Sequence, residues 1–237
     1  MRNLYLTIIL AIAVTILNGC LQNTISGNGN IKTQSRDVKA FKSFNVSGGY
    51  DVYLQKGDKE ALTIEADENL LPIIISEVKD SVLNVYNQHT ILRSKKQKLI
   101  ITCPNLSSIE LSGATDLKGD SCFVMNNLKI NVSGAAKIDL NVIVSELKTD
   151  VSGSAELIFA GKAKEFSTSL SGAGKIKADN LEAKNCSIEI SGMGEAKVNV
   201  SDKLDVTISG MGQVEYIGNP EINQNISGAG KVKRLEK

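Results

Sequence analysis

The sequence predicts an all-β protein, a single-stranded parallel β-helix (β-solenoid) with about 18–21 residues in each coil. Three observations lead to this prediction. A Ser-Gly motif recurs at a nearly constant spacing, apolar and polar residues alternate on both sides of it, and no segment after residue 20 keeps the apolar spacing of a helix. The composition agrees, because 20 glycines against 3 prolines, without tryptophan, suit short strands and tight corners.

The Ser-Gly motif marks a corner that is repeated once per coil. Seven copies begin at residues 112, 133, 152, 171, 191, 209 and 227, in steps of 21, 19, 19, 20, 18 and 18 residues. A period near 20 residues is the sequence signature of a solenoid. Two earlier segments, ISGNGNIKT from Ile25 and VSGGYDVYL from Val46, fit the same frame. The corner residues that we expect to be structural are Ser112, Gly113, Ser133, Gly134, Ser152, Gly153, Ser171, Gly172, Ser191, Gly192, Ser209, Gly210, Ser227 and Gly228.

The residues around each corner follow the period of a strand with one buried face. The residue before the serine is always aliphatic: Leu111, Val132, Val151, Leu170, Ile190, Ile208 and Ile226. The pattern resumes after the corner, and a looser polar return such as KADN or VSDK closes each unit. An antiparallel meander is the alternative, but it does not need the same corner in every unit. Stacked coils, about 4.8 Å apart, do need it.

Each corner has residue types that suit stacking. Glycine permits positive φ and close backbone approach. The serine hydroxyls can bond along their column or to the corner backbone. The fifth residue of the motif forms a column of largely alternating charge, Asp116, Lys137, Glu156, Lys175, Glu195, Gln213 and Lys231. Opposite charges on neighbouring strands stabilise and like charges destabilise, so we interpret this column as a guide to register.

The segment 57–101 is less regular. ALTIEAD, IIISEVKDSVLNVYNQ and KLIITCP read as strands, and QHTILRSKKQK reads as a basic loop containing Lys95, Lys96 and Lys98. The corner motif flanks the segment on both sides. We therefore expect wider, irregular coils of the same solenoid rather than a separate N-terminal sheet.

The N-terminus has the pattern of an export signal. Arg2 is followed by an apolar run from Leu4 to Leu17, and LNGC, ending at Cys20, resembles the bacterial lipobox. We predict a lipoprotein signal peptide at 1–19, lipid attachment at Cys20, a tether at 20–25 and a β-helix domain at 26–237. The protein would then be lipid-anchored in the cell envelope, at the outer membrane, facing the periplasm or the medium. An uncleaved anchor helix is the alternative.

Charge and cysteines exclude some classes. The formal net charge is +1, so there is no electrostatic reason to expect a nucleic acid as partner. Cys103, Cys122 and Cys186 lack the CxxC spacing of zinc or thioredoxin-like sites. Cys186 occupies an apolar position and is expected to be a buried thiol. A disulfide between Cys103 and Cys122 is open.

The whole pattern resembles a known family. The lipobox is followed by ISGNGNIKT, FKSFNVSGGYDVYLQKGD, LTIEADENLLPIIISEVKDSVLNVY and repeated SGAGK. This combination is similar to the family described as "putative auto-transporter adhesin, head GIN domain". The resemblance covers about residues 27–237. It implies a right-handed β-helix in the cell envelope and brings no catalytic residues with it.

The sequence predicts no catalytic site, cofactor or metal site. His89 is the only histidine, and no G-x-S-x-G elbow is present. Acidic residues stand in columns with lysine, and Asp51 with Asp58 makes at best a weak site. Met193 and Met211, at equivalent corner positions, are either stacked packing or a small apolar patch.

Two functions remain from these patterns. The first is a non-catalytic envelope lipoprotein whose solenoid surface binds glycan or protein in adhesion. The alternative is an accessory subunit of an envelope complex, docked or oligomerised through the solenoid ends. Charges in the last segment, KRLEK, suggest a self-capped end and favour the first. A polysaccharide-active β-helix enzyme is a third, weaker reading.

Overall fold

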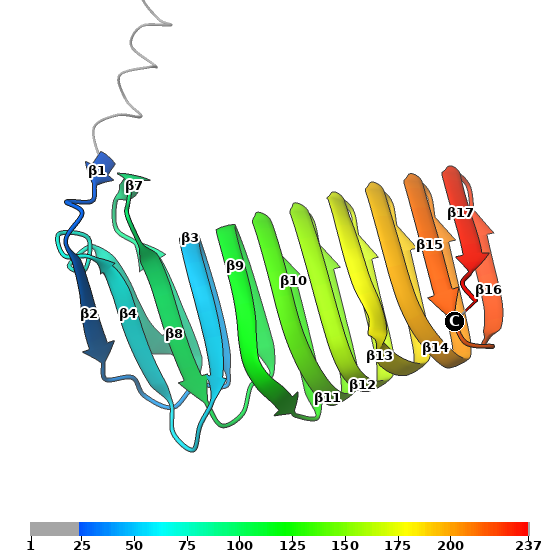
Figure 1. The fold of residues 1–237 in the computed structure, drawn as a ribbon, viewed down its shortest axis with the longest axis horizontal. Coiled ribbons are helices and arrows are strands. Elements are labelled where there is room, and N and C mark those ends of the chain that lie inside the picture. Colours follow the sequence, from blue (N-terminus) through cyan, green and yellow to red (C-terminus); the bar gives the residue numbers. More distant parts are fainter. Residues whose placement is uncertain (1–23, 237) are drawn as a thin grey trace, which may run out of the picture.

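The computed structural model describes residues 24–236, which form strands, turns and loops without a helix. Figure 1 shows the coils lined up as a rod, with the first described strand and the last coil at opposite ends. Parallel pairing of successive coils confirms the predicted β-solenoid. Within the described residues no helix is long and apolar enough to cross a membrane.

The repeat region contains nine strands, which stack as coils. They are β9 (Ser108–Val124), β10 (Asn127–Val132), β11 (Ala135–Val151), β12 (Ser154–Leu170), β13 (Ala173–Ile190), β14 (Met193–Ile208), β15 (Met211–Ile217), β16 (Glu221–Ile226) and β17 (Ala229–Arg234). Equivalent repeat positions pair in parallel, so that Lys137 lies opposite Glu156, and Glu156 opposite Lys175. The returns KADN and VSDK, expected as loops, lie within β13 and β14. The breaks between these strands fall at the Ser-Gly corners, except for those at 125–126 and 218–220.

The core is one continuous column of alternate residues. The aliphatic residues that precede the corner serines from Leu111 to Ile208 are at most 3% exposed. Two polar residues share this column: Thr149 donates a hydrogen bond from its hydroxyl to the Thr168 hydroxyl, 2.7 Å away, and both side chains are buried. Because each buried hydroxyl has its partner on the neighbouring coil, their burial costs little.

Close stacking explains the corner glycines better than backbone conformation does. The predicted positive φ is found at Gly113, at 121°, but the other six corner glycines have ordinary φ. At each of those six, an added Cβ would lie less than 3.0 Å from the glycine carbonyl oxygen of the preceding coil. The expectation about φ is therefore wrong for most of the column, and the expectation about close approach is correct.

The corner serines satisfy backbone groups of the neighbouring coil. Ser112 donates from its hydroxyl to Ser47, at 2.9 Å. Ser171 donates to the Val151 carbonyl oxygen, at 3.3 Å, and Ser152 makes the same contact to Val132 at 3.4 Å. Both modes that the sequence suggested, along the column and to the corner backbone, are present.

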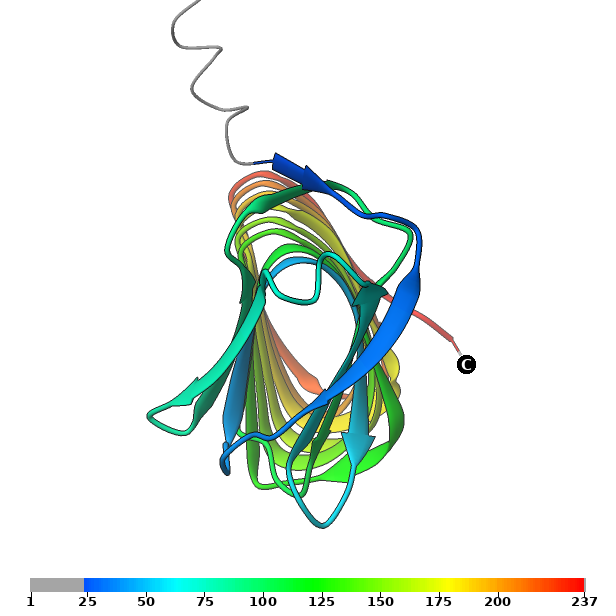
Figure 2. The same cartoon turned by 90° about the vertical axis from the view of Figure 1, so that its left-hand side faces the viewer.

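The N-terminal third forms a cap over one end of the solenoid. Its strands are β1 (Thr24–Ser26), β2 (Ile31–Arg36), β3 (Ser43–Lys56), β4 (Ala61–Asp67), β5 (Ile74–Lys79), β6 (Val82–Asn87), β7 (Thr90–Arg93) and β8 (Gln97–Cys103). β1 and β7 form a separate two-stranded sheet, and the other strands of the segment belong to the same 15-stranded sheet as the repeats. Figure 2 looks onto this end, where the cap strands lie in front of the oval outline of the coils.

Strand direction in the cap differs from the expectation of irregular parallel coils. β6 and β8 pair in parallel with β3, but β5 runs antiparallel to β6, and β4 runs antiparallel to β8 and β2. β3 also pairs in parallel with β9 on its other side. The chain therefore leaves β3, builds the cap with residues 57–107, and returns to stack β9 on β3.

Only one of the two early motif copies belongs to the corner column. Gly48 pairs with Gly113, so VSGGYDVYL is a true coil. The copy ISGNGNIKT is not: Ile25 lies in β1, which pairs with β7 in a separate two-stranded sheet, and β2 is antiparallel to β4. The assignment of ISGNGNIKT to the corner column was wrong because the parallel neighbour of β1 is β7, in a separate sheet, and not a coil of the corner column.

The cap is held by two polar anchors that the sequence pattern did not reveal, the buried Asp67 and the half-buried Arg36. The Asp67 carboxylate is fully buried and accepts hydrogen bonds from the backbone N–H groups of Gly29 and Lys95, at 2.6 and 2.8 Å. Arg36 donates to the carbonyl oxygens of Leu71 and Ile74, at 2.7 and 2.6 Å. These contacts tie β2 and the loop before β8 to the turn that follows β4.

Candidate functional site

A shallow trough runs along the face of the solenoid just after the corners, and we call it the corner trough. Its floor consists of the third and fourth residues of each motif, which are mostly alanine or glycine. Two hollows open along it, of about 550 Å³ beside the cap and about 630 Å³ near the C-terminal end. The hollows exist because these residues are small, since bulky side chains at these positions would fill them.

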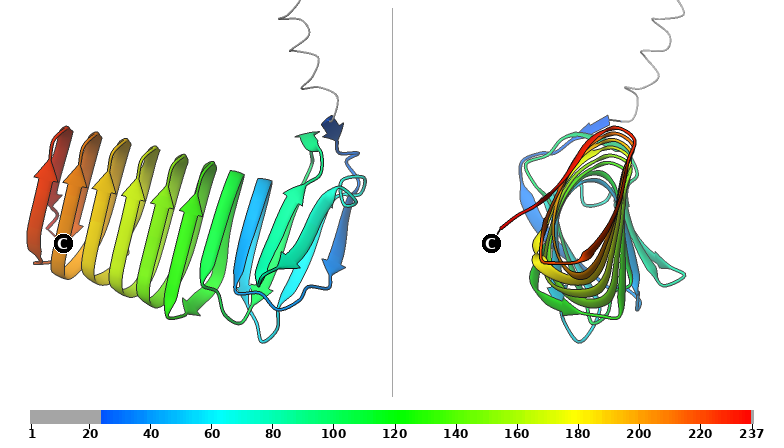
Figure 3. Two further views of the ribbon diagram at one scale, coloured as in Figure 1. Left: turned by 180° about the vertical axis from the view of Figure 1, so that it is seen from behind. Right: turned by 90° about the vertical axis from the view of Figure 1, so that its right-hand side faces the viewer.

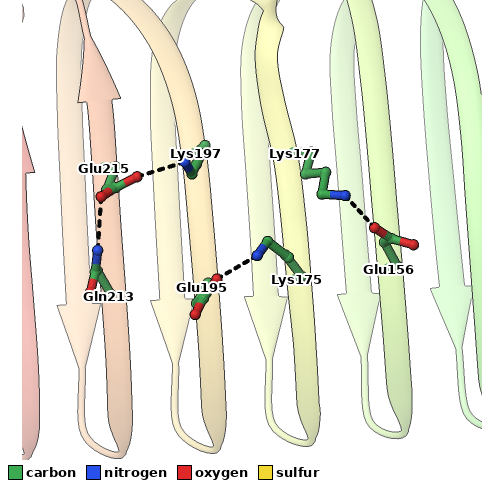
Figure 4. A network of polar contacts seen from close by, with 7 residues as sticks. All are labelled: Glu156, Lys175, Lys177, Glu195, Lys197, Gln213 and Glu215. Carbon is green, nitrogen blue, oxygen red and sulfur yellow. Dashed lines mark hydrogen bonds and ion pairs between the residues drawn. The ribbon is translucent and has the colours of Figure 1, made fainter. Parts of the chain in front are cut away.

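One wall of the trough is a ladder of ion pairs. Lys137 Nζ lies 3.0 Å from Glu156 Oε2, Lys175 Nζ lies 2.7 Å from Glu195 Oε2, and Lys197 pairs with Glu215 at 3.0 Å. Figure 4 shows part of this wall, where the Lys175–Glu195 and Lys197–Glu215 pairs join neighbouring coils. Two pairs of the predicted charge column, Lys137–Glu156 and Lys175–Glu195, therefore form contacts in register, and the Lys197–Glu215 pair lies two positions further along.

Glu156 bridges two coils at once. It binds Lys177 from the next coil and Lys137 from the previous one. Hydrogen bonds from Lys177 and then from Lys137 lower the pKa of Glu156 from 4.5 to about 2. The carboxylate is exposed, so this pair of contacts orders the wall rather than supplying much stability.

The end of the trough beside the cap collects polar atoms without protein partners. Gln97 Oε1, Thr115 Oγ1 and Asp116 Oδ1 are buried, and none has a hydrogen-bond partner among the described residues. Thr115 is only 4% exposed. Buried oxygens of this kind are costly unless something bonds to them. They come from β8 and β9, which lie on either side of β3 in the sheet.

The hollow near the C-terminal end of the trough has an apolar part. Met193 and Met211 face each other on neighbouring coils and are 56% and 57% exposed. More than half of each residue is exposed, so the pair adds apolar surface to this hollow. Beside them Gly194 and Gly212 form the floor over buried aliphatic side chains. Methionine is flexible and polarizable and adapts to irregular partners.

The segment 88–98, expected as a basic loop, instead contains β7 and the start of β8, and most of its charge is engaged. Lys96 Nζ lies 2.7 Å from Glu65, and Lys98 lies over the Tyr53 ring, 4.2 Å from its centroid. Lys95 reaches the carbonyl oxygen of Gly29 at 3.5 Å. Lys95 and Lys96 line the hollow beside the cap, whereas His89 lines a different hollow with Tyr86 and Asn87. The basic loop is therefore part of the cap and of the trough.

The cysteines are separate thiols. Cys103 and Cys186 are buried and Cys122 is half-buried, and all three are free. The open disulfide between Cys103 and Cys122 is thus not formed. The expected burial of Cys186 is confirmed. Cys20, the predicted lipid attachment site, and the signal peptide 1–19 lie outside the described residues.

The comparison with known families gives one match. The family model described as "Putative auto-transporter adhesin, head GIN domain" matches residues 40–220. The chain belongs to this family. The match begins just before β3 and ends after β15, so the head GIN domain includes most of the cap, most of the trough and all coils except the last.

Solved structures share the fold across the described chain. A "putative adhesin" from Bacteroides fragilis NCTC 9343 has 25% identity and a TM-score of 0.82, covering 89% of this chain and 100% of that one. A "putative adhesin" and a "putative lipid binding protein" from Parabacteroides distasonis ATCC 8503 have 22% and 23% identity, TM-scores of 0.76 and 0.73, and coverage of 90% and 100%. No curated protein sequence matches the chain.

Among the sites of this head GIN domain, three were not found from sequence. Asp67 ends a strand pattern, and nothing in that pattern indicates that its carboxylate binds distant backbone groups. Gln97 and Thr115 look like ordinary strand residues. Their shared hollow appears only when β8 and β9 flank β3. Within residues 24–236, no three or more His, Cys, Asp or Glu side chains cluster in a way that could hold a metal ion.

Proposed function

We propose that the protein is a non-catalytic, adhesin-like binding protein of the cell envelope that holds a glycan chain in the corner trough. The observation that supports this best is the group of unpaired buried oxygens at Gln97, Thr115 and Asp116. A carboxylate, an amide oxygen and a hydroxyl are the acceptors that sugar hydroxyls bind, and Lys95 and Lys137 at the same hollow supply donors.

The form of the trough supports an extended ligand. Equivalent positions recur at each coil, so a chain lying along the axis meets similar small residues and charged groups at every step. The family and the structures described as adhesins agree with a binding role. The exposed Met193 and Met211 would pack against apolar faces of the sugar rings or of an attached group.

Binding to an array of bacterial and plant polysaccharides tests this proposal. We expect Asp116→Ala to lower the affinity for the bound glycan by about tenfold, since hydrogen bonds to charged groups are worth roughly 1.5–3 kcal/mol. Asp205→Ala is the matched control. Asp205 also has one unpaired buried oxygen and one paired with lysine, at 2.8 Å from Lys203, but it lies outside both hollows of the trough.

Two results would contradict the proposal. One is an array without any bound glycan. The other is an equal loss in Asp116→Ala and Asp205→Ala, which would show that the effect comes from the fold and not from the trough. Incubating the protein with the bound glycan and measuring reducing or unsaturated ends tests the non-catalytic part, and we expect no release.

We further propose that Cys20 carries the lipid anchor. The described chain starts at Thr24 on the cap end of the rod, so an anchor at Cys20 would place the cap next to the membrane and the last coil away from it (Figure 1). Mass spectrometry of the mature N-terminus should find an acylated Cys20. In Cys20→Ala the protein should move from the membrane fraction to the soluble fraction, and an unchanged distribution would refute the anchor.

A further inference from the structure

The two ends of the solenoid differ in how their last strands are covered. At the cap end, Leu70 and Ile74 are buried and antiparallel strands close the sheet. At the other end, all six residues of β16 are exposed, and the inward-facing Ile222 and Ile226 are 38% and 37% exposed. Figure 3 shows that no strand of the described chain crosses this end.

The last segment does not cap this end as the sequence suggested. Lys233 and Arg234 belong to β17, which pairs with β15 along its full length. β17 and β16 are therefore edge strands that have a neighbouring strand on one side only. An exposed strand edge is a ready template for pairing with another strand, and proteins usually block or use it.

The outward-facing charges of β17 are all positive. Lys231 and Lys233 both point outward from β17, opposite Gln213 and Glu215 of the previous coil. The Glu215 carboxylate is already bound by Lys197, at 3.0 Å, and by Gln213, at 2.8 Å. Within residues 24–236 neither Lys231 nor Lys233 makes an ion pair within 4.0 Å, although Lys233 contributes to lowering the pKa of Glu215.

The interior of the ladder shows how the fold completes such a pair of lysines. Lys175 and Lys177 occupy the same two positions on β13 as Lys231 and Lys233 on β17. The next coil places Glu195 opposite Lys175 and Lys197 opposite Lys177. Lys175 binds Glu195, and Lys177 instead binds Glu156 on the previous coil (Figure 4). At β17 only the previous coil is present, so the next rung is missing.

A second copy of this chain is a poor occupant. If β17 paired antiparallel with itself, so that the inward Val232 residues met, Lys231 would lie opposite Lys233 of the second copy at two places. Like charges directly opposite each other destabilise a strand pair. The edge strand at the cap end, β2, has Lys32 and Arg36 and no acidic residue, so head-to-tail stacking meets the same repulsion.

We propose that the β16–β17 edge accepts a β-strand of another protein that carries acidic residues at two alternate positions. The strand would extend the sheet by backbone hydrogen bonds, and its two carboxylates would face Lys231 and Lys233 as Glu195 faces Lys175. This site lies on the end of the rod and is independent of glycan binding in the trough.

A peptide taken from the protein's own ladder provides the probe. Residues 191–200 stack on the coil of Lys175 and Lys177, with Glu195 opposite Lys175 and Lys197 opposite Lys177. Carrying Lys197→Glu, this peptide presents two carboxylates in the required register. The same peptide with Glu195→Lys and the native Lys197 is the matched basic control.

Fluorescence anisotropy of the labelled peptides with the purified protein measures binding. We expect the acidic peptide to bind at least about fivefold more tightly than the basic one, from two cross-strand pairs. The preference should reverse in the double variant Lys231→Glu, Lys233→Glu, and should weaken as salt rises to 1 M. Amide shifts in an NMR titration should concentrate in β16 and β17.

Three outcomes would overturn the inference: absence of binding by the acidic peptide, equal binding of both peptides, or a preference that the double variant leaves unchanged. Sedimentation at rising concentration tests the competing occupant, since dimers that dissociate on charge reversal at β17 would show that a second copy covers the edge. Asp116→Ala should leave peptide binding intact, which separates this test from that of the trough.

Discussion

Gly172 lies directly over Gly153, so closely that an added Cβ on Gly172 would lie less than 3.0 Å from the Gly153 carbonyl oxygen. Gly172→Ala must therefore push two coils apart in the middle of the rod. We expect a loss of about 1–3 kcal/mol in the free energy of unfolding, as for other overpacked sites. Urea denaturation followed by circular dichroism measures it.

Gly49→Ala is the control for that substitution. Gly49 lies in the trough with ordinary φ, and a Cβ there would meet only the Ala114 carbonyl oxygen, at 3.9 Å. Its stability should change by less than about 0.5 kcal/mol. If Gly172→Ala were equally mild, the corner column would not be tightly stacked.

The bridging position of Glu156 predicts an unusual titration. Because the folded pKa of Glu156 is lowered to about 2 from 4.5, its contribution to stability is complete above pH 4.5 and disappears as the pH falls through about 2. Carbon NMR of the side-chain carboxyl group should show this low pKa. Lys177→Gln removes the larger cause and should move the pKa upward towards 4.5, whereas an unchanged value would refute the bridge.

The Asp67 anchor predicts that the cap depends on a single carboxylate. Burial raises the pKa of Asp67, but backbone hydrogen bonds from Gly29, Lys95 and Lys96 outweigh it, so the pKa lies below 3.8. Stability from Asp67 is thus present above pH 3.8 and is lost as the pH falls below the lowered value. Asp67→Asn turns an N–H group towards these donors and should cost about 1–3 kcal/mol.

Hydrogen exchange can localise that effect. The Lys95 and Lys96 amides should exchange faster in Asp67→Asn, while amides of β12 and β13 keep their protection. Uniform acceleration over the whole rod would mean that the cap and the coils unfold as one unit, in contradiction to a local anchor.

The three thiols predict a graded reactivity. Burial, with a smaller effect of Glu60, raises the pKa of Cys103 to about 11, and burial also raises the pKa of Cys186. At pH 8 both should remain unmodified by a thiol reagent in the folded protein, and half-buried Cys122 should react first. Peptide mass spectrometry identifies the labelled cysteine. A peptide pair linked through Cys103 and Cys122 would contradict the free thiols.

The solenoid could be predicted from sequence because its information is local and repeated. Each coil contains its own alternation and its own corner, and the charge column reports which residues face each other between coils. Lys137 and Glu156 are an example, since their register follows from the period alone. The charge column does not predict the diagonal contact of Lys177, which binds Glu156 on the previous coil although the residue directly opposite it there is Ile158.

The cap could not be predicted in the same way because the alternation of apolar and polar residues does not reveal the direction of a strand. ALTIEAD reads equally well as a parallel or an antiparallel strand, and only its pairing with β8 and β2 decides. The candidate site suffers from the same gap. Gln97 of β8 and Thr115 of β9 line one hollow because β8 and β9 are both neighbours of β3 in the sheet. This arrangement arises only when the chain, after building the cap, places β9 beside β3.

The alternating wall of lysine and glutamate also restricts how the rod can change in length. Removing the single unit 152–170 would bring Lys137 opposite Lys175, whereas removing 152–190 would bring it opposite Glu195. In this column, deleting or duplicating two coils therefore keeps opposite charges on neighbouring coils and a single-coil step does not, although the rod holds like charges in register elsewhere, as at Lys177 opposite Lys197.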